Sequence, residues 1–577
     1  MNASTANRLW LLGIPLAAAM AVAPLAVHGP SYGHDFHFHL LNWMEAGRQF
    51  AHGTLYPQWV FSAAFNAGEP RFVFYPPLSW TLGALLGLLL THIPRLSGDA
   101  AWTAAPILYT WICLTTSGLT MYRASRAYAG PAAALLASVL YVLNPYMLFT
   151  AYERTAYAEL LAAAWMPLLL AALLRDQLRA RQIAISIALL WLTNAPAAVI
   201  GCYTLAFLAL VRLISDTHEH PFLTRLRRNT LRIALPAVSG TLLGVGLAAI
   251  YFVPAAYERQ FVQVGMAIIG NGRVDQNFLF EQTGASPDAR MHDAVLGIAS
   301  WIAVALLAAT IIALLLCWNN QRKQPAGIPV FPLRPLAALF AVAAFLLTAP
   351  STPIWQHAPE LPFLQFPWRL LTLIAPIFAL GFAAALSQVR LRAWAVVVAA
   401  GVSAALLTFI CYGQFRQYTD PDESVSATLQ GFERNQGTDP TDEYTPQTAD
   451  NDALHPGDPP YWLASQALAG PPIGSTPGPA PRHLHLTTKA GEYLILNLRD
   501  YPGWAVSVNG RVDTDRVPRE DGLIAFPVPA GGATIDLRYR RMRDDIVGDG
   551  ITPVSLLILL LLEVRRERAS LSGAPAT

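Results

Sequence analysis

The chain is organised around one stretch, HDFHFHLLNWMEAGRQFAHGTLYPQWVFSAAFNAGEPRFVFYPP, which covers residues 34–77. It follows the first apolar segment and is the densest polar and aromatic patch of the N-terminal half. It opens with one acid, Asp35, and closes with Tyr75 and two prolines, where a new apolar helix begins. Three histidines surround the acid: His34, His37 and His39. We interpret this stretch as a loop that presents polar groups at one face of a membrane.

The composition favours a membrane protein. Charged residues make up 13% of the 577 residues, about half the usual share, and apolar residues make up 54% in long blocks. The mean hydropathy is +0.38, which is typical of several membrane-spanning helices. The net charge of +2 and the lack of a basic, aromatic cluster argue against nucleic-acid binding. The four cysteines are far apart, so neither a zinc site nor a disulfide framework is expected.

Apolar blocks predict about twelve transmembrane helices. Residues 1–27 would also suit a signal peptide, but we interpret them as a retained first span. The turn formed by Thr193–Pro196 divides one long apolar block into a helical hairpin. The predicted spans are 8–27, 100–122, 131–150, 158–174, 182–195, 197–213, 231–253, 294–317, 333–349, 369–388, 393–412 and 548–562.

Arginines and lysines at alternate loops orient these spans, because such loops stay in the cytoplasm. The basic loops all lie on one side of the membrane only if 74–92 does not cross it. We therefore interpret 74–92 as a juxtamembrane or re-entrant helix. Both termini are then predicted to be cytoplasmic, and the outer face carries loop 28–99 and the block 413–547.

The domain organisation follows from these spans. Residues 1–412 form the predicted transmembrane domain, and 548–577 form the last span and its tail. Within the outer block, 413–482 is rich in Asp, Pro, Gly, Thr and Gln and is predicted to be irregular. Five β-rich segments within 483–541 predict a small antiparallel sandwich. They are 483–487, 492–497, 504–508, 523–528 and 534–539.

The predicted spans carry almost no charge at mid-depth, which argues against an ion-coupled transporter. The candidate chemistry lies in the outer loops. Asp35 has two interpretations: a solvated acid or helix N-cap, or a general base that activates an acceptor hydroxyl. The histidines could join Asp35 in a metal site, but we favour interfacial packing as their explanation.

Two further outer turns carry charge. Glu153, Arg154 and Glu159 lie within seven residues, and they suit either an interfacial anchor or a second acid beside a phosphate-binding arginine. Arg369 follows Gln365 and Trp368 at the start of a span, where it either snorkels or binds a lipid phosphate. No phosphate-cradling glycine motif is present, so a nucleotide donor has no support.

The residues also carry a resemblance. Asp35 with His39, Phe74–Leu78, Asn144–Tyr146, Arg154–Glu159 and Gln365–Arg369 resemble a bacterial polytopic family labelled "6-pyruvoyl-tetrahydropterin synthase-related". The chain is similar to YfhO-type proteins along nearly its whole length and, more broadly, to the GT-C glycosyltransferases. That resemblance implies a GT-C fold in the bacterial inner membrane, with a polyprenyl-phosphate sugar donor used on the periplasmic side.

Carried over by position, the resemblance implies roles for individual residues. Asp35 would be the catalytic acid, Glu153 or Glu159 the second acidic group, and Arg154 or Arg369 the phosphate ligand. His37, His39, Tyr75, Gln365 and Trp368 would contact substrate. The first loop lacks the paired acids of some GT-C enzymes, so a divalent metal is an open expectation, and no metal ligand is assigned.

The leading hypothesis is therefore sugar transfer from a polyprenyl-phosphate donor to a glycan, lipid or protein acceptor. The first alternative is a non-enzymatic envelope assembly or lipid-handling protein, and the second is a transporter. The transferase hypothesis predicts that Asp35, one of Glu153 and Glu159, and an arginine line one outward cavity open to lipid.

Overall fold

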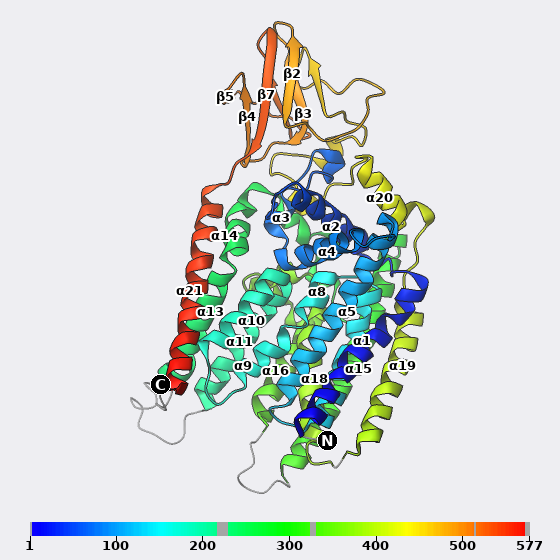
Figure 1. Ribbon diagram of the computed structural model, residues 1–577, viewed down its shortest axis with the longest axis vertical. Coiled ribbons are helices and arrows are strands. Elements are labelled where there is room, and N and C mark those ends of the chain that lie inside the picture. Colours follow the sequence, from blue (N-terminus) through cyan, green and yellow to red (C-terminus); the bar gives the residue numbers. More distant parts are fainter. Residues whose placement is uncertain (1–2, 216–228, 323–330, 390, 513–514, 572–577) are drawn as a thin grey trace.

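A computed structural model describes residues 3–215, 229–322, 331–389, 391–512 and 515–571. Helices run side by side in one bundle, and the β-strands gather beyond one end of it, which we call the sheet end (Figure 1). The two ends of the described chain both lie at the opposite end (Figure 1). The predicted fold class, mainly helical and polytopic with a C-terminal β-rich part, is confirmed.

The helices have the following bounds in chain order. They are α1 (Ala3–His28), α2 (Phe36–Ala51), α3 (Arg71–Phe74), α4 (Pro77–Thr91), α5 (Gly98–Ser125), α6 (Pro131–Val142), α7 (Pro145–Tyr152), α8 (Tyr157–Ala162), α9 (Met166–Leu173), α10 (Ala180–Thr193), α11 (Ala195–Ser215), α13 (Leu235–Leu247), α14 (Ala249–Glu258), α15 (Pro287–Gln321), α16 (Leu333–Leu346), α17 (Thr352–His357), α18 (Leu371–Leu386), α19 (Ala393–Phe415), α20 (Val425–Glu433) and α21 (Arg543–Leu571).

Within the described ranges, eight helical segments are long and apolar enough to cross a membrane. The bent pair Leu333–Leu346 and Ala349–His357 adds a ninth if it is one broken span. The eight coincide with eight of the twelve predicted spans. They are Trp10–His28, Pro131–Tyr152, Ala195–Ile214, Thr230–Leu247, Pro287–Gln321, Pro367–Leu386, Ala393–Phe415 and Arg543–Val564.

Three predicted spans differ from these. Helix α5 has 28 residues, but its polar and aromatic side chains keep it outside this apolar set. Segment 158–174 is broken into α8 and α9. Helix α10 has 14 residues and rises roughly 21 Å, less than a ~30 Å hydrocarbon core. Helix α10 ends at the predicted turn. Asn194 begins the next helix there, because its side chain caps α11 by accepting the Ala197 backbone N–H at 2.9 Å.

The segment 74–92 contains helix α4, which lies with α2 and α3 at the sheet end of the bundle (Figure 1). Its 15 residues rise roughly 22 Å, too little to cross the core upright. Two of its glycines allow close packing, because a Cβ at Gly83 would lie 2.1 Å from the Trp43 ring and one at Gly87 would lie 2.2 Å from Trp102. These observations support the juxtamembrane interpretation.

The β-rich part consists of two antiparallel sheets, ordered β1-β3-β6 and β2-β7-β4-β5. Each predicted strand overlaps an observed one, and the inward side chains Leu494, Val506, Ile524 and Ile535 are fully buried. Two strands were not predicted: β1, which lies in the segment predicted to be irregular, and β5. The strands are β1 (Tyr461–Ala464), β2 (His483–Thr488), β3 (Tyr493–Arg499), β4 (Trp504–Val508), β5 (Arg511–Val512), β6 (Leu523–Pro527) and β7 (Gly531–Tyr539).

The first outer loop is anchored to these sheets. Trp59 packs against Tyr501 and Trp504, with ring centroids 5.6 Å apart in both cases. Buried Arg71 pairs with Glu69 at 2.6 Å and donates to the Thr441 hydroxyl at 2.9 Å. The loop therefore lies between the sheets and the bundle, and both sides hold it in place.

Candidate active site at the sheet end of the bundle

Asp35 is held at the start of α2 by the chain that follows α7. The backbone N–H of Asp35 donates to the Arg154 carbonyl at 2.9 Å, and that of His34 donates to the Glu153 carbonyl at 3.2 Å. This contact requires glycine at position 33, because a Cβ there would lie 2.2 Å from the Glu153 carbonyl oxygen. The Asp35 carboxylate makes no capping hydrogen bond and its side chain is 44% exposed. The carboxylate is therefore accessible to solvent or to a ligand.

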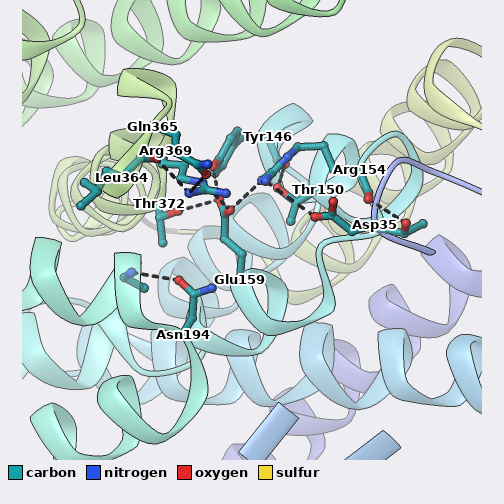
Figure 2. Close-up of polar contacts among 12 residues, drawn as sticks. Asp35, Tyr146, Thr150, Arg154, Glu159, Asn194, Leu364, Gln365, Arg369 and Thr372 are labelled. Atoms are coloured by element: carbon teal, nitrogen blue, oxygen red, sulfur yellow. Dashed lines mark hydrogen bonds and ion pairs between the residues drawn. The ribbon is translucent and has the colours of Figure 1, made fainter. Parts of the chain in front are cut away.

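Arg154 is the basic partner of that carboxylate. Its Nη2 lies 4.0 Å from Asp35 Oδ2, while its Nη1 donates to Glu159 Oε2 at 2.6 Å (Figure 2). The guanidinium also stacks over the Trp368 ring at 4.7 Å. Burial opposes the charged form, but the Glu159 and Asp35 carboxylates outweigh it and raise the pKa of Arg154. Arg154 therefore stays charged beneath the surface.

Glu159 lies at the centre of the buried network. It accepts hydrogen bonds from the Tyr146 hydroxyl and, at 3.4 Å, from the Thr372 hydroxyl (Figure 2). Arg369 Nε lies 3.5 Å from its Oε2. One carboxylate thus faces two arginines, and the side chain of Glu159 is only 6% exposed.

Gln365 positions the second arginine. Its side-chain oxygen accepts from Arg369 Nη1 at 3.3 Å, and its amide donates to the Ala267 carbonyl at 2.6 Å. The Arg369 Nε makes no hydrogen bond although it is buried. This nitrogen therefore interacts with Glu159 by charge, at 3.5 Å, without a hydrogen bond.

Both turns that carry the network hold a residue in the left-handed backbone region. Thr155, next to Arg154, has φ +48°, and Gln365, four residues before Arg369, has φ +62°. Non-glycine residues adopt such angles at a cost, and they persist where the surrounding structure holds them. The two turns are therefore fixed by tertiary contacts.

Aromatic rings border Asp35. His39 is 1% exposed and lies among Tyr75, Tyr157 and Trp43, at centroid distances of 5.8, 5.3 and 6.2 Å. Burial lowers the pKa of His39 to about 4, so its ring is neutral at physiological pH. Burial also raises the pKa of the Tyr75 hydroxyl, and the nearby Asp35 adds to that shift.

A cavity of about 500 Å³ lies beside this network. One wall is polar and includes His34, His37 and Glu153, and the other is apolar and comes from α15, a candidate span. Glu153 accepts from the Gln417 amide at 2.6 Å, and burial raises its pKa. Of the three groups predicted to line one cavity, only the acid Glu153 does so, because neither Asp35 nor an arginine is among the residues of its walls.

The histidines do not gather around one point. The His37 ring is 2.6 Å from the Glu423 carbonyl oxygen, and His39 is enclosed by aromatic rings. Among the described residues, Asp35 belongs to no group of three ligands that could share a metal ion. The described residues around Asp35 therefore provide no group of three metal ligands, and we derive no step through a metal there.

The structure thus brings together Asp35, Arg154, Glu159, Arg369 and Gln365 (Figure 2). The Trp368 ring stacks on Arg154, and Tyr75 lies close enough to Asp35 for its charge to raise the Tyr75 pKa. Glu153 is directed away from this network toward the cavity. Sequence reasoning missed Gly33, Tyr146, Thr372 and Gln417. Tyr146 was visible beside Asn144 and Pro145, but the other three stand in segments with no distinguishing pattern.

No family model matches the chain, and the comparison with curated proteins finds no match either. The named resemblances to the "6-pyruvoyl-tetrahydropterin synthase-related" family and to YfhO-type proteins are therefore not shown. Similar solved structures are found. One is the arabinofuranosyltransferase AftD from mycobacteria, with 18% identity and a TM-score of 0.41, covering 70% of this chain.

Two other solved structures are similar. The apo oligosaccharyltransferase of Archaeoglobus fulgidus has 15% identity and a TM-score of 0.43, and covers 74% of this chain. ArnT from Cupriavidus metallidurans, bound to undecaprenyl phosphate, has 11% identity and a TM-score of 0.28, and covers 76%. The chain spans 27% of AftD and 59% of the oligosaccharyltransferase. These figures describe a coarse likeness of fold.

Proposed function

We propose that the chain transfers a sugar from a polyprenyl-phosphate donor to an acceptor. Transfer would take place at the membrane face that lies at the sheet end of the bundle. The observation that carries this proposal is the half-exposed Asp35 carboxylate held against buried, charged Arg154 at the end of the bundle. The neighbouring cavity supports it, because a wall of polar groups opposite a wall of α15 side chains suits a ligand with a sugar and a hydrocarbon tail.

The proposed step is a single displacement. Asp35 takes the proton of an acceptor hydroxyl as its oxygen attacks the anomeric carbon of the donor sugar. The bond between that carbon and the phosphate oxygen breaks, and the polyprenyl phosphate leaves with the electron pair. In this proposal Arg154 stabilises the leaving phosphate with its fixed charge, and Arg369, beside Glu159, adds to the positive field.

The remaining groups position or contact substrate in this proposal. Glu159 holds both arginines, and Glu153, His34 and His37 face the sugar from the polar wall of the cavity. The sheet end is then the periplasmic face of a bacterial inner membrane, and both termini are cytoplasmic. The acceptor is a glycan, lipid or protein, and the outer β-rich domain covers the site.

The test is Asp35→Asn, assayed in membranes supplied with radiolabelled polyprenyl-phosphate sugar. The substitution keeps the size of the side chain and removes the base, so we expect transfer to fall by about 10²–10⁴-fold. Asp99→Asn is the matched control, because Asp99 is an exposed acid in the first turn of α5 that accepts from the Ser426 hydroxyl and lies outside the network. It should transfer sugar at the wild-type rate.

Undiminished transfer by Asp35→Asn at normal expression would remove Asp35 from the mechanism. The non-enzymatic alternative predicts a different pattern. Acids of the network would be dispensable for envelope assembly, whereas deletion of the outer domain would abolish it. Comparing envelope glycans of cells with wild-type protein, Asp35→Asn and no protein therefore separates the two functions.

A further inference from the structure

Three buried carboxylates meet where the bundle joins the sheets, away from the network around Asp35. Glu258 ends α14, and Asp544 and Asp545 lie in the first turn of α21. One oxygen of each lies within 4.8 Å of the others. Their exposed fractions are 0%, 6% and 2%. In Figure 1, α21 runs beside α14 after leaving β7.

The ordinary explanation for acids at this position is incomplete. Carboxylates in the first turn of a helix are stabilised by its dipole, which would account for an exposed Asp544 or Asp545. It does not account for their burial or for Glu258, which ends a different helix. Three carboxylates enclosed together repel one another and lose hydration unless a positive charge or protons compensate.

The hydrogen bonds leave part of the cluster unsatisfied. Glu258 Oε2 accepts from the Tyr501 hydroxyl at 2.5 Å, and Asp545 accepts from the Gln58 amide and the Met542 backbone N–H. Both oxygens of Asp544 and Oε1 of Glu258 accept no hydrogen bond. Three buried oxygens therefore lack a donor.

The basic side chain nearby does not fill this role. Arg541, on the segment that joins β7 to α21, pairs with Asp549 one turn further along α21. Its interaction with Asp545 is through space, and the structure records no ion pair between them among the described residues. Among the described residues, no basic side chain is recorded in an ion pair with any of the three acids, although one oxygen of each lies within 4.8 Å of the others.

We propose that Glu258, Asp544 and Asp545 hold a Ca²⁺ ion. Three carboxylates without histidine or cysteine are the ligands of a hard cation, and they can supply up to six oxygens. Oxygens up to 4.8 Å apart fit opposite sides of an ion with ligand distances of about 2.3–2.6 Å. Mg²⁺ binds shorter, keeps several waters and needs fewer carboxylates, so Ca²⁺ fits better.

The ion would fasten three parts of the chain that are distant in sequence. Helix α21 already packs closely on α14, since a Cβ at Gly548 would lie 2.6 Å from the Ala249 carbonyl oxygen and Thr552 accepts the Ile250 N–H at 2.8 Å. Gln58 brings the first outer loop to the same point through Asp545. The site is thus structural and does not depend on the proposed transfer reaction.

The experiment uses the purified full-length chain in lipid nanodiscs after treatment with a chelator. Equilibrium dialysis with ⁴⁵Ca²⁺ measures stoichiometry, and tryptophan fluorescence on heating measures stability. We expect about one Ca²⁺ per chain and a higher unfolding temperature with CaCl₂ than with MgCl₂ at the same concentration. Asp544→Asn should lose both effects. Its side chain makes no hydrogen bond in the structure, so this variant breaks none and is expected to fold.

The control is Glu520→Gln, because Glu520 is an exposed acid of the outer domain. It should bind calcium as the wild type does. Lack of bound calcium in the wild type would overturn the proposal and leave a shared proton as the compensating charge. Equal binding by Asp544→Asn, or tighter binding of Mg²⁺ than of Ca²⁺, would also overturn it.

Discussion

Replacing Glu159 with glutamine tests how the buried network is held. The carboxylate faces Arg154 at 2.6 Å and Arg369 at 3.5 Å, and these two side chains are only 6% and 14% exposed. Glutamine keeps the volume but removes the negative charge. Arg369 then lacks a counter-ion and Arg154 keeps only the more distant Asp35, at 4.0 Å. Removing one partner from a buried pair costs about 3–5 kcal/mol. The free energy of unfolding of Glu159→Gln should fall by that amount.

The assay is unfolding in mixed detergent micelles, followed by tryptophan fluorescence. Glu153→Gln is the matched control, because burial raises the pKa of Glu153 and a neutral side chain therefore costs little there. Because the pKa of Glu153 is higher in the folded state, protonation of this carboxyl stabilises the folded state at low pH. That contribution to stability is lost as the pH rises. At neutral pH, the midpoint of the unfolding transition of Glu153→Gln should equal that of the wild type or lie slightly above it.

A double variant separates the charge effect from lost packing. Adding Arg369→Gln to Glu159→Gln removes one unpaired charge, so the pair of changes should destabilise less than their sum by about 0.5–3 kcal/mol. Equal stabilities of Glu159→Gln and Glu153→Gln would refute the reasoning. Strict additivity in the double variant would refute the coupling between Glu159 and Arg369.

Two further variants probe the surroundings of Asp35. The pKa of His39 is about 4 in the folded chain and 6.5 ordinarily, so stability should fall by roughly 3 kcal/mol as pH drops through that window. His39→Phe should flatten this acid limb when unfolding is measured at several pH values, and an unchanged limb would contradict the assignment. Gly33→Ala should reduce sugar transfer about 10²-fold, because its Cβ would push Asp35 from Arg154. Gly130→Ala, whose Cβ meets nothing within 4 Å, should transfer sugar at the wild-type rate. Equal transfer rates in Gly33→Ala and Gly130→Ala would contradict the requirement for glycine at position 33.

The parts of the fold that hydropathy governs could be predicted from the sequence. Spans such as 393–412 are continuous apolar runs, and the helix in 74–92 was placed by counting charged loops. The break between α8 and α9 was not predicted, because residues 160–174 form one apolar run and Pro167, in the first turn of α9, was not interpreted as a break. Strand β1 was missed because only four residues of it pair with β3.

The candidate site was predicted as a set of residues, and their pairing was not. Spacing in the sequence could not tell whether Glu153 or Glu159 meets an arginine, since both are close to Arg154. The choice depends on where α7 ends, which turns Glu153 toward the cavity and leaves Glu159 inside. The cluster of Glu258, Asp544 and Asp545 could not be predicted either, because Glu258 is almost 300 residues from the two aspartates in sequence.

The charges of the network explain why Asp35 is held loosely. Arg154 and Arg369 outnumber Glu159, so the buried part carries one positive charge, and Asp35 balances it from 4.0 Å away. Under the proposed function, a donor phosphate competes with Asp35 for Arg154 and frees the carboxylate to meet the acceptor. Asp35→Asn should then bind the donor more tightly while transferring sugar far more slowly. A partly exposed pair is worth up to about 1 kcal/mol, so the gain in affinity should be up to about five-fold. Binding of a non-hydrolysable polyprenyl-phosphate sugar measures it, and weaker binding by Asp35→Asn would show that Asp35 holds the donor and does not compete with it.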